Sequence, residues 1–291
     1  TAATLLDQLQ RLSSRQADLQ RQVATGQRIR QPGDDPAAAA RVVAARMESG
    51  AIAQFARNAS AALEYSKTSY GGLEQLKKVS DRASELAVLG EGSLDPDAMR
   101  AYAAEANQLL EQAAGLGNTR FGNDYVFSGT AVSTQPFALT RDASGVISTV
   151  AYAGDSGRLT VPLSESSGIQ PVPDAATNSG LADMLNRLVA LRDALSSGDA
   201  AAVRAVRPGL EDSENLLVGA LSEHGAVQLR IEVARVQQKS RADELERQIS
   251  SEADADITES IVQLNQTTQA YEAALSSSAS ILKLSLLDYL R

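Results

Sequence analysis

Residues 51–89, AIAQFARNASAALEYSKTSYGGLEQLKKVSDRASELAVL, place small or apolar side chains three and four residues apart with no break in phase. This spacing puts them on one face of a single α-helix. The row consists of Ile52, Phe55, Ala59, Ala62, Ser66, Ser69, Leu73, Leu76, Ser80, Ala83 and Ala87. Gly71 and Gly72 keep the phase, although each costs about 1 kcal/mol against alanine in a helix. The pair therefore predicts a weak point in one very long helix, and not its end.

The start of this helix is marked by QPGDDPAAAAR, residues 31–41. We expect Asp35 to be the N-cap and Pro36 the first helical residue, because proline at that position loses no N–H that the helix needs. GEGSLDP, residues 90–96, ends the helix, and a shorter helix is expected from Pro96 to about Leu116. Helical phase returns over residues 181–191, 210–221 and about 226–249.

Both chain ends carry further rows of apolar residues at coiled-coil spacing. The N-terminal row is Leu5, Leu9, Leu12, Leu19 and Val23, and the C-terminal row is Ile257, Ile261, Leu264, Thr268, Tyr271, Leu275, Ser278 and Leu282, with Leu287 beyond. Between about residues 117 and 180, β-branched and aromatic residues alternate with Asp, Gly and Ser turns, which predicts short strands and hairpins. The helices from the two ends thus flank a β-rich insertion.

The predicted fold class is mainly α, a long antiparallel helical bundle built from both termini, with a small β domain. We expect terminal coiled-coil helices over residues 1–24 and 257–291. The helical bundle would comprise residues 25–130 and 181–256, with a short β element near 120–130. The β-rich inserted outer domain would comprise residues 131–180.

Composition argues against several classes of function. The 291 residues carry 27 basic and 36 acidic groups, a formal net charge of −9, which disfavours both nucleic acid and anionic membrane surfaces as partners. Cysteine is absent, so disulfides and thiolate metal sites are excluded. The only histidine, His224, precedes a glycine, and we expect it to be a capping or surface residue. We also see no signal peptide and no apolar run near the length of a transmembrane helix.

The paired carboxylates Asp34 and Asp35 have two possible interpretations. They could be metal ligands of a hydrolase, or they could begin the helix, where free N–H groups and the helix dipole favour carboxylates. The proline and the alanine run that follow favour the helix start. Phosphate-binding and dinucleotide-binding glycine motifs are also missing. We therefore predict that the protein is not an enzyme and has neither a metal nor another cofactor.

Small or polar residues interrupt the apolar rows where a self-sufficient coiled coil would have Leu or Ile. The rows are compatible with an ordinary bundle interior. They are equally compatible with terminal helices that neighbouring subunits complete, as in rings or helical assemblies. The residues alone leave both alternatives open.

Four segments together resemble one family. QVATGQRIRQPGDDPAAAARVVAAR, residues 22–46, is similar to the N-terminal signature of flagellins and flagellar hook-associated proteins. NTRFGNDYVFSGTAVSTQPF, residues 118–137, and VAYAGDSGRLTVPL, residues 150–163, resemble the hook–filament junction proteins (hook-associated protein 3) more than filament flagellin. The C-terminal DADITESIVQLNQTTQAYEAALSSSASILKLSLLDYLR, residues 254–291, looks like the terminal helix of the same family.

The resemblance implies a structural adaptor that joins the hook, through the first junction protein, to the flagellin filament. Its expected partners are that hook-side protein, flagellin, further copies of itself in a ring, and a cytosolic export chaperone on the C-terminal helix. It implies an extracellular flagellar location after export by the flagellar type III apparatus, without a cleaved signal peptide. A filament flagellin is the alternative within the family, and an amphipathic membrane binder is another.

The resemblance also assigns roles to residues. Subunit packing is expected from Thr25, Gly26, Arg28 and Ile29 at the turn, and from the terminal rows, namely Leu5, Leu9, Leu12, Leu19, Ile257, Ile261, Leu264, Tyr271, Leu275, Leu282 and Leu287. Structural roles are expected for Asp34, Asp35 and Pro36 at the helix start, and for Phe121, Tyr125, Phe127 and Gly129 in the β element.

Overall fold

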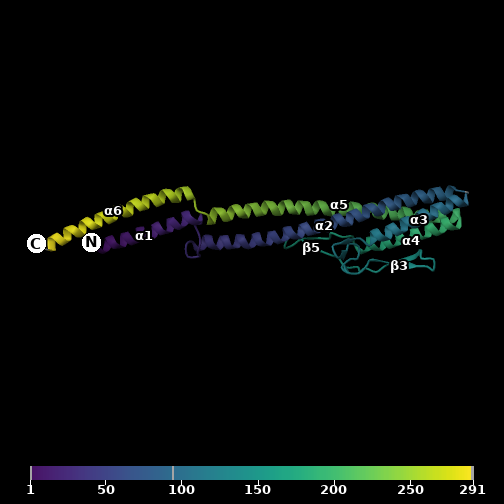
Figure 1. The fold of residues 1–291 in the computed structure, drawn as a ribbon, viewed down its shortest axis with the longest axis horizontal. Helices are drawn as coiled ribbons and strands as arrows, with labels where there is room; N and C mark the ends of the chain where they lie inside the picture. The colour runs from purple at the N-terminus through teal and green to yellow at the C-terminus, as the bar shows by residue number, and fades with distance from the viewer. Residues whose placement is uncertain (1, 94, 290–291) are drawn as a thin grey trace. The chain divides into compact units, whose positions relative to one another are not determined.

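The computed structural model describes residues 2–93 and 95–289, and the side chains of these residues except positions 2, 3, 5 and 281–289. Within this part of the chain the helices are α1 (Ala2–Thr25), α2 (Pro36–Gly92), α3 (Pro96–Gly117), α4 (Ala175–Ser197), α5 (Ala200–Ala253) and α6 (Ile257–Tyr289) (Figure 1). Short antiparallel hairpins lie between α3 and α4. The predicted fold class, mainly α with a β-rich insertion, is confirmed.

Aspartates begin the helices where the sequence predicts them. α2 starts at Pro36, and the carboxylate Oδ1 of Asp35 accepts a hydrogen bond of 3.0 Å from the N–H of Ala38. α3 starts at Pro96 behind Asp95, which caps it in the same way. In each case a carboxylate satisfies an N–H group that has no partner inside the helix, and proline follows where its missing N–H costs nothing.

The predicted inward row of α2 is buried over most of its length. Every member from Ala59 to Ala87 is buried, and Ile52 and Phe55 are partly buried. The helix continues without a break through Gly71 and Gly72. Gly72 lies against the ring of the fully buried Phe127, and a Cβ at this position would be 3.0 Å from ring atom Cζ. The absence of a side chain therefore makes room for an aromatic ring from the β element.

α5 is longer than the periodicity indicates. It begins at Ala200, where the carboxylate of Asp199 accepts from two backbone N–H groups, and it includes Pro208 in its first turns. Val203 is buried in the core, and this burial supports the segment before the predicted start at residue 210. His224 lies inside this helix and is 3% exposed, so the prediction of a capping or surface residue is wrong.

The strands form three separate two-stranded antiparallel sheets within the described residues. They are β1 (Arg120–Phe121) with β2 (Asp124–Tyr125), β3 (Phe137–Arg141) with β4 (Ile147–Tyr152), and β5 (Val161–Pro162) with β6 (Gly168–Ile169). In the longest pair Phe137 lies opposite Tyr152, and Phe137, Ile147 and Val150 are buried. The side-chain amide of Asn186 on α4 hydrogen-bonds both backbone groups of Val150, at 2.9 and 2.8 Å, and so holds β4 against that helix.

The described chain divides into two compact units. The terminal unit comprises residues 1–52 and 240–291, and the central unit comprises residues 53–239. The main hydrophobic core belongs to the central unit, where α3 and α4 pack together with the inward faces of α2 and α5. No helix within residues 2–93 and 95–289 is both long and apolar enough to cross a membrane.

Candidate assembly surface

Helices α1 and α6 of the terminal unit pack antiparallel to each other (Figure 1). Leu19 is the one apolar residue with a buried side chain among the described side chains of this pair. The other buried positions are Ser260 and Thr267, which are polar, while Leu9 and Leu12 are only partly buried. The amide of Gln16 donates a 3.2 Å hydrogen bond to the hydroxyl of Thr268 across the pair. Little apolar area therefore holds these two helices together.

The predicted C-terminal row of α6 is buried only in part. Leu264 and Tyr271 are partly buried. Leu264 lies one helical turn after the buried Ser260, and Tyr271 one turn after the buried Thr267. Ile257, Ile261 and Leu275 are 47%, 43% and 44% exposed. We call these three residues the exposed row. The side chains of Leu5, Leu282 and Leu287 lie outside the described part of the structure.

The turn after α1 has the geometry that a Thr-Gly pair favours. The hydroxyl of Thr25 donates to the carbonyl of Arg21 at 2.8 Å, and Gly26 takes a left-handed backbone conformation with φ of 69°. Its N–H donates back to the carbonyl of Gln22 at 2.8 Å, so glycine closes the helix in a conformation that strains other residues.

Backbone hydrogen bonds join this turn to the junction between α5 and α6. The N–H groups of Arg28 and Ile29 donate to the carbonyl of Ala253, at 2.7 and 3.3 Å, and the N–H of Ala255 donates to the carbonyl of Gly26 at 2.9 Å. The two places where the chain enters and leaves the terminal helix pair are thus tied to each other.

Charged side chains reinforce the same connection. The guanidinium of Arg41 makes two hydrogen bonds of 2.9 Å to the carboxylate of Glu252, and Arg28 donates to the carbonyl of Glu252 at 2.6 Å. Arg28 also lies 3.4 Å from the carboxylate of Asp35. The hydrogen bonds from Arg41 hold the pKa of Glu252 below its usual value. We call Gly26–Ile29, Asp35, Arg41 and residues 252–255 the clamp.

Sequence reasoning placed Arg28, Ile29 and Asp35 at this site but missed Arg41, Glu252 and Ala253. Glu252 begins the acidic segment EADADITES, residues 252–260, which by its sequence indicates only that a helix starts there. In the structure Asp256 lies at the start of α6, and its carboxylate accepts from the N–H of Glu259 at 3.0 Å. A bond between residues 211 positions apart leaves no local pattern in the sequence.

Asp34 and Asp35 have different tasks. Asp35 caps α2, while the carboxylate of Asp34 accepts from the backbone N–H groups of Arg30 and Gln31, at 2.9 and 3.0 Å. Backbone hydrogen bonds lower the pKa of both carboxyl groups. Asp34 and Asp35 line an open cavity of about 460 Å³, together with Arg21, Arg28 and Arg30. Among the described residues, no group of three His, Cys, Asp or Glu side chains is arranged to hold a metal ion.

The aromatic residues of the β element are part of the core of the central unit. Phe127 is fully buried, the ring of Phe121 packs on Tyr65 with centroids 4.6 Å apart, and the guanidinium of Arg120 lies 4.2 Å from the ring centre of Tyr125. Gly129 has φ of 70°, and a Cβ there would overlap Asp155. These residues shape the fold around the hairpin.

Comparison with known proteins finds sequence similarity to flagellar proteins. Residues 1–132 match the model of the bacterial flagellin N-terminal helical region. Flagellar hook-associated protein 3 of Salmonella typhimurium is 27% identical over 223 residues, which are 70% of this chain and 70% of that protein.

Solved structures share the fold. A putative flagellar hook-associated protein from Vibrio parahaemolyticus superimposes with a TM-score of 0.67 at 18% identity, over 76% of this chain and all of that one. FlgL from Bacillus cereus gives 0.61 at 18% identity, over 71% and 99% of the two chains. The chain is thus similar to the bacterial flagellin N-terminal helical region over residues 1–132 and to a flagellar hook-associated protein 3 over 70% of its length, and it shares the fold of the solved structures.

Proposed function

We propose that this chain is a structural adaptor of the bacterial flagellum, which joins the hook to the flagellin filament through its terminal helices. Its similarity to flagellar proteins supports a place in the extracellular flagellum and association with other flagellar components and with copies of itself. Its role is to hold other proteins together, and we assign it no catalytic step.

The observation that carries the proposal is the exposed row on a terminal helix pair that has little core of its own. Burying a whole isoleucine side chain is worth about 1.5–3 kcal/mol, and Ile257 and Ile261 leave close to half of theirs in water. A neighbouring helix that covered the row would gain this stabilisation once per subunit. The isolated chain supplies no such helix among its described residues.

The partners follow from the family and from geometry. A subunit between two different neighbours needs a head-to-tail contact, which closes into a ring when the rotation permits. We assign the hook side to the first junction protein and the other side to flagellin. The C-terminal helix would bind a cytosolic chaperone before export through the flagellar type III apparatus.

The clamp has a definite task in this proposal. It connects the two chain segments that lead into the terminal helices, so that α1 and α6 reach a neighbour as one body. The bonds come from backbone groups and from a two-point arginine–carboxylate contact, and both kinds of contact fix orientation as well as distance.

A deletion strain tests the proposal. Loss of the gene should send unpolymerised flagellin into the medium, and the wild-type gene should restore filaments. Ile261→Ser should fail to restore them, whereas Ile261→Val, which keeps an apolar side chain in the row, should succeed. Equal complementation by both variants, with equal export of both proteins, would show that the exposed row is not an assembly surface.

Electron microscopy separates the adaptor from a filament flagellin. An adaptor should remain monomeric or form short oligomers when the purified protein is concentrated. Long filaments formed by this chain alone would favour the flagellin alternative.

A further inference from the structure

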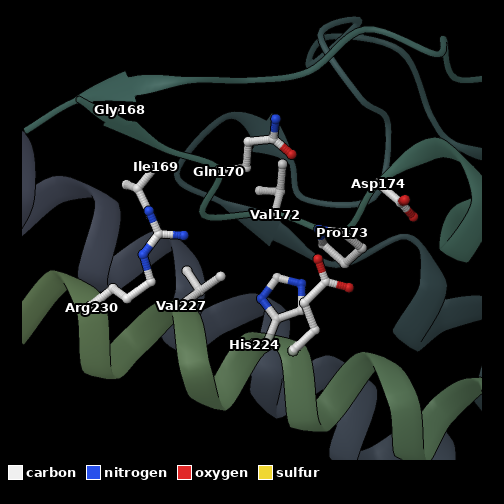
Figure 2. A pocket seen from close by; sticks show the side chains of 10 residues that line it. Gly168, Ile169, Gln170, Val172, Pro173, Asp174, His224, Val227 and Arg230 are labelled. Carbon is white, nitrogen blue, oxygen red and sulfur yellow. The ribbon is translucent and has the colours of Figure 1, made fainter. Parts of the chain in front are cut away.

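A second cavity lies in the central unit and shares no residue with the clamp. It has a volume of about 260 Å³ and lies between the segment 168–174, which leads from β6 into α4, and one face of α5 (Figure 2). From α5 it receives Glu223, His224, Val227 and Arg230. Figure 2 shows His224 beside Pro173 and Arg230 on the side of Ile169, so polar groups stand on both sides of an apolar middle.

His224 lines this cavity and carries a polar atom without a hydrogen-bond partner. The side chain is 3% exposed, and its ring nitrogen Nδ1 is buried without a hydrogen-bond partner. Burial lowers the pKa of His224 to about 4, so the ring is neutral near pH 7. A buried polar atom without a partner costs roughly 1–3 kcal/mol, and native structures contain few of them. A ligand that hydrogen-bonds to Nδ1 would recover this cost.

Charged groups of both signs line the cavity and have no partner. Within residues 2–93 and 95–289, neither Arg230 nor Glu223 makes an ion pair or hydrogen bond. Asp174, by contrast, caps α4, because its carboxylate accepts a hydrogen bond of 2.8 Å from the N–H of Thr177. Seven residues separate Glu223 from Arg230, which corresponds to roughly 10 Å along the helix axis.

We propose that this cavity binds a small zwitterion of the size of a dipeptide. Its carboxylate would pair with the guanidinium of Arg230, its ammonium group with the carboxylate of Glu223, and its central amide would hydrogen-bond to Nδ1 of His224. An extended dipeptide separates its two charges by about 7 Å, which the flexible Arg230 and Glu223 side chains can accommodate. The carboxylates of Glu223 and Asp174 would repel a ligand that carries only a negative charge, and the guanidinium of Arg230 would repel a ligand that carries only a positive charge.

The size of the cavity restricts the ligand further. About 260 Å³ is less than the roughly 300 Å³ at which pockets for drug-sized molecules begin. Val172 and Val227 line the middle, so small apolar side chains fit there best. Alanyl-alanine is therefore the appropriate probe.

The single histidine of the chain makes the test direct, because the ¹⁵N resonances of an imidazole can only come from His224. Alanyl-alanine added to the full-length protein should shift the Nδ1 resonance to saturation. N-acetyl-alanyl-alanine lacks the ammonium group and alanyl-alanine amide lacks the carboxylate, so each should bind at least tenfold more weakly. Absence of a saturable shift, or equal affinity for a blocked form, overturns the proposal.

Variants of the two charged residues complete the experiment. Arg230→Gln and Glu223→Gln should each weaken alanyl-alanine binding at least tenfold in calorimetric titration, with unchanged thermal unfolding of the free protein. Arg235→Gln removes a charge from the same helix outside the cavity and should leave binding unchanged. Unchanged affinity in Arg230→Gln or Glu223→Gln, or an equal loss in Arg235→Gln, contradicts the assignment.

Discussion

Replacing each of the two adjacent glycines of α2 by alanine should change stability in opposite directions. At Gly71 nothing lies within 4 Å of an added Cβ, so Gly71→Ala gains only helix propensity, about 1 kcal/mol. At Gly72 the added Cβ would lie 3.0 and 3.1 Å from two atoms of the Phe127 ring. Overpacking a core costs about 1–3 kcal/mol, and we use about 2 kcal/mol because the approach is only slightly too close.

The net expectation is that Gly71→Ala stabilises the central unit by about 1 kcal/mol and that Gly72→Ala destabilises it by about 1 kcal/mol. Thermal unfolding followed by circular dichroism measures this, since 1 kcal/mol shifts the midpoint by about 2–4 °C in a unit of this size. Phe127→Leu should remove the penalty of Gly72→Ala in a double-mutant cycle. Equal stabilisation by both alanines would refute the packing of Gly72 against Phe127.

Three further predictions concern the histidine, the terminal pair and the paired aspartates. Burial lowers the pKa of His224 to about 4 from an ordinary 6.5, so as the pH falls this histidine is protonated in the unfolded chain before it is protonated in the folded protein. The contribution of the neutral buried ring to the free energy of unfolding is therefore complete above about pH 6.5 and is lost as the pH falls toward 4. An NMR titration midpoint near 6.5 would contradict this. Leu19→Ala should destabilise the α1–α6 pair by about 2–3 kcal/mol, because Leu19 is its buried apolar side chain among those described. Amide hydrogen exchange should become faster in α1 and α6 while α3 and α4 stay protected. An equal increase in all four helices would contradict a separate terminal pair. Calorimetric titration with Mg²⁺, Mn²⁺ and Zn²⁺ should detect no binding at millimolar concentrations. Micromolar binding that is lost in the Asp34→Asn, Asp35→Asn double variant would instead support the two aspartates as metal ligands of a hydrolase.

Much of the central helix is predictable because its signals are local. The row from Ala59 to Ala87 repeats at helical spacing, and all its members are buried. The start at Pro36 is encoded within two residues, by a carboxylate that caps and a proline that needs no N–H partner. Gly72 shows the limit of this reasoning. Propensity alone indicates a weak point there, whereas the ring of Phe127 explains why glycine occupies the position.

The candidate assembly surface was only partly predictable. Ile257, Ile261, Leu264, Tyr271 and Leu275 form one row by spacing, yet the structure leaves three of them exposed and buries the other two in part. A repeated spacing places residues on one face of a helix but does not give the width of the contact that covers this face, so periodicity alone cannot tell which of them α1 buries. The burial of His224 was missed for a related reason, because a lone histidine carries no periodic signal.

The amino-acid sequence by itself determined where α2 and α3 begin, which face of α2 is buried, that the middle of the chain forms hairpins, and which family the segments resemble. These properties depend on interactions within a few residues or on a repeated spacing. The tertiary structure alone decided that Arg41 binds Glu252, that Gly72 accommodates Phe127, and that part of the terminal row remains in water. Such contacts join positions far apart in the chain, and their energies appear only when folding brings those positions together.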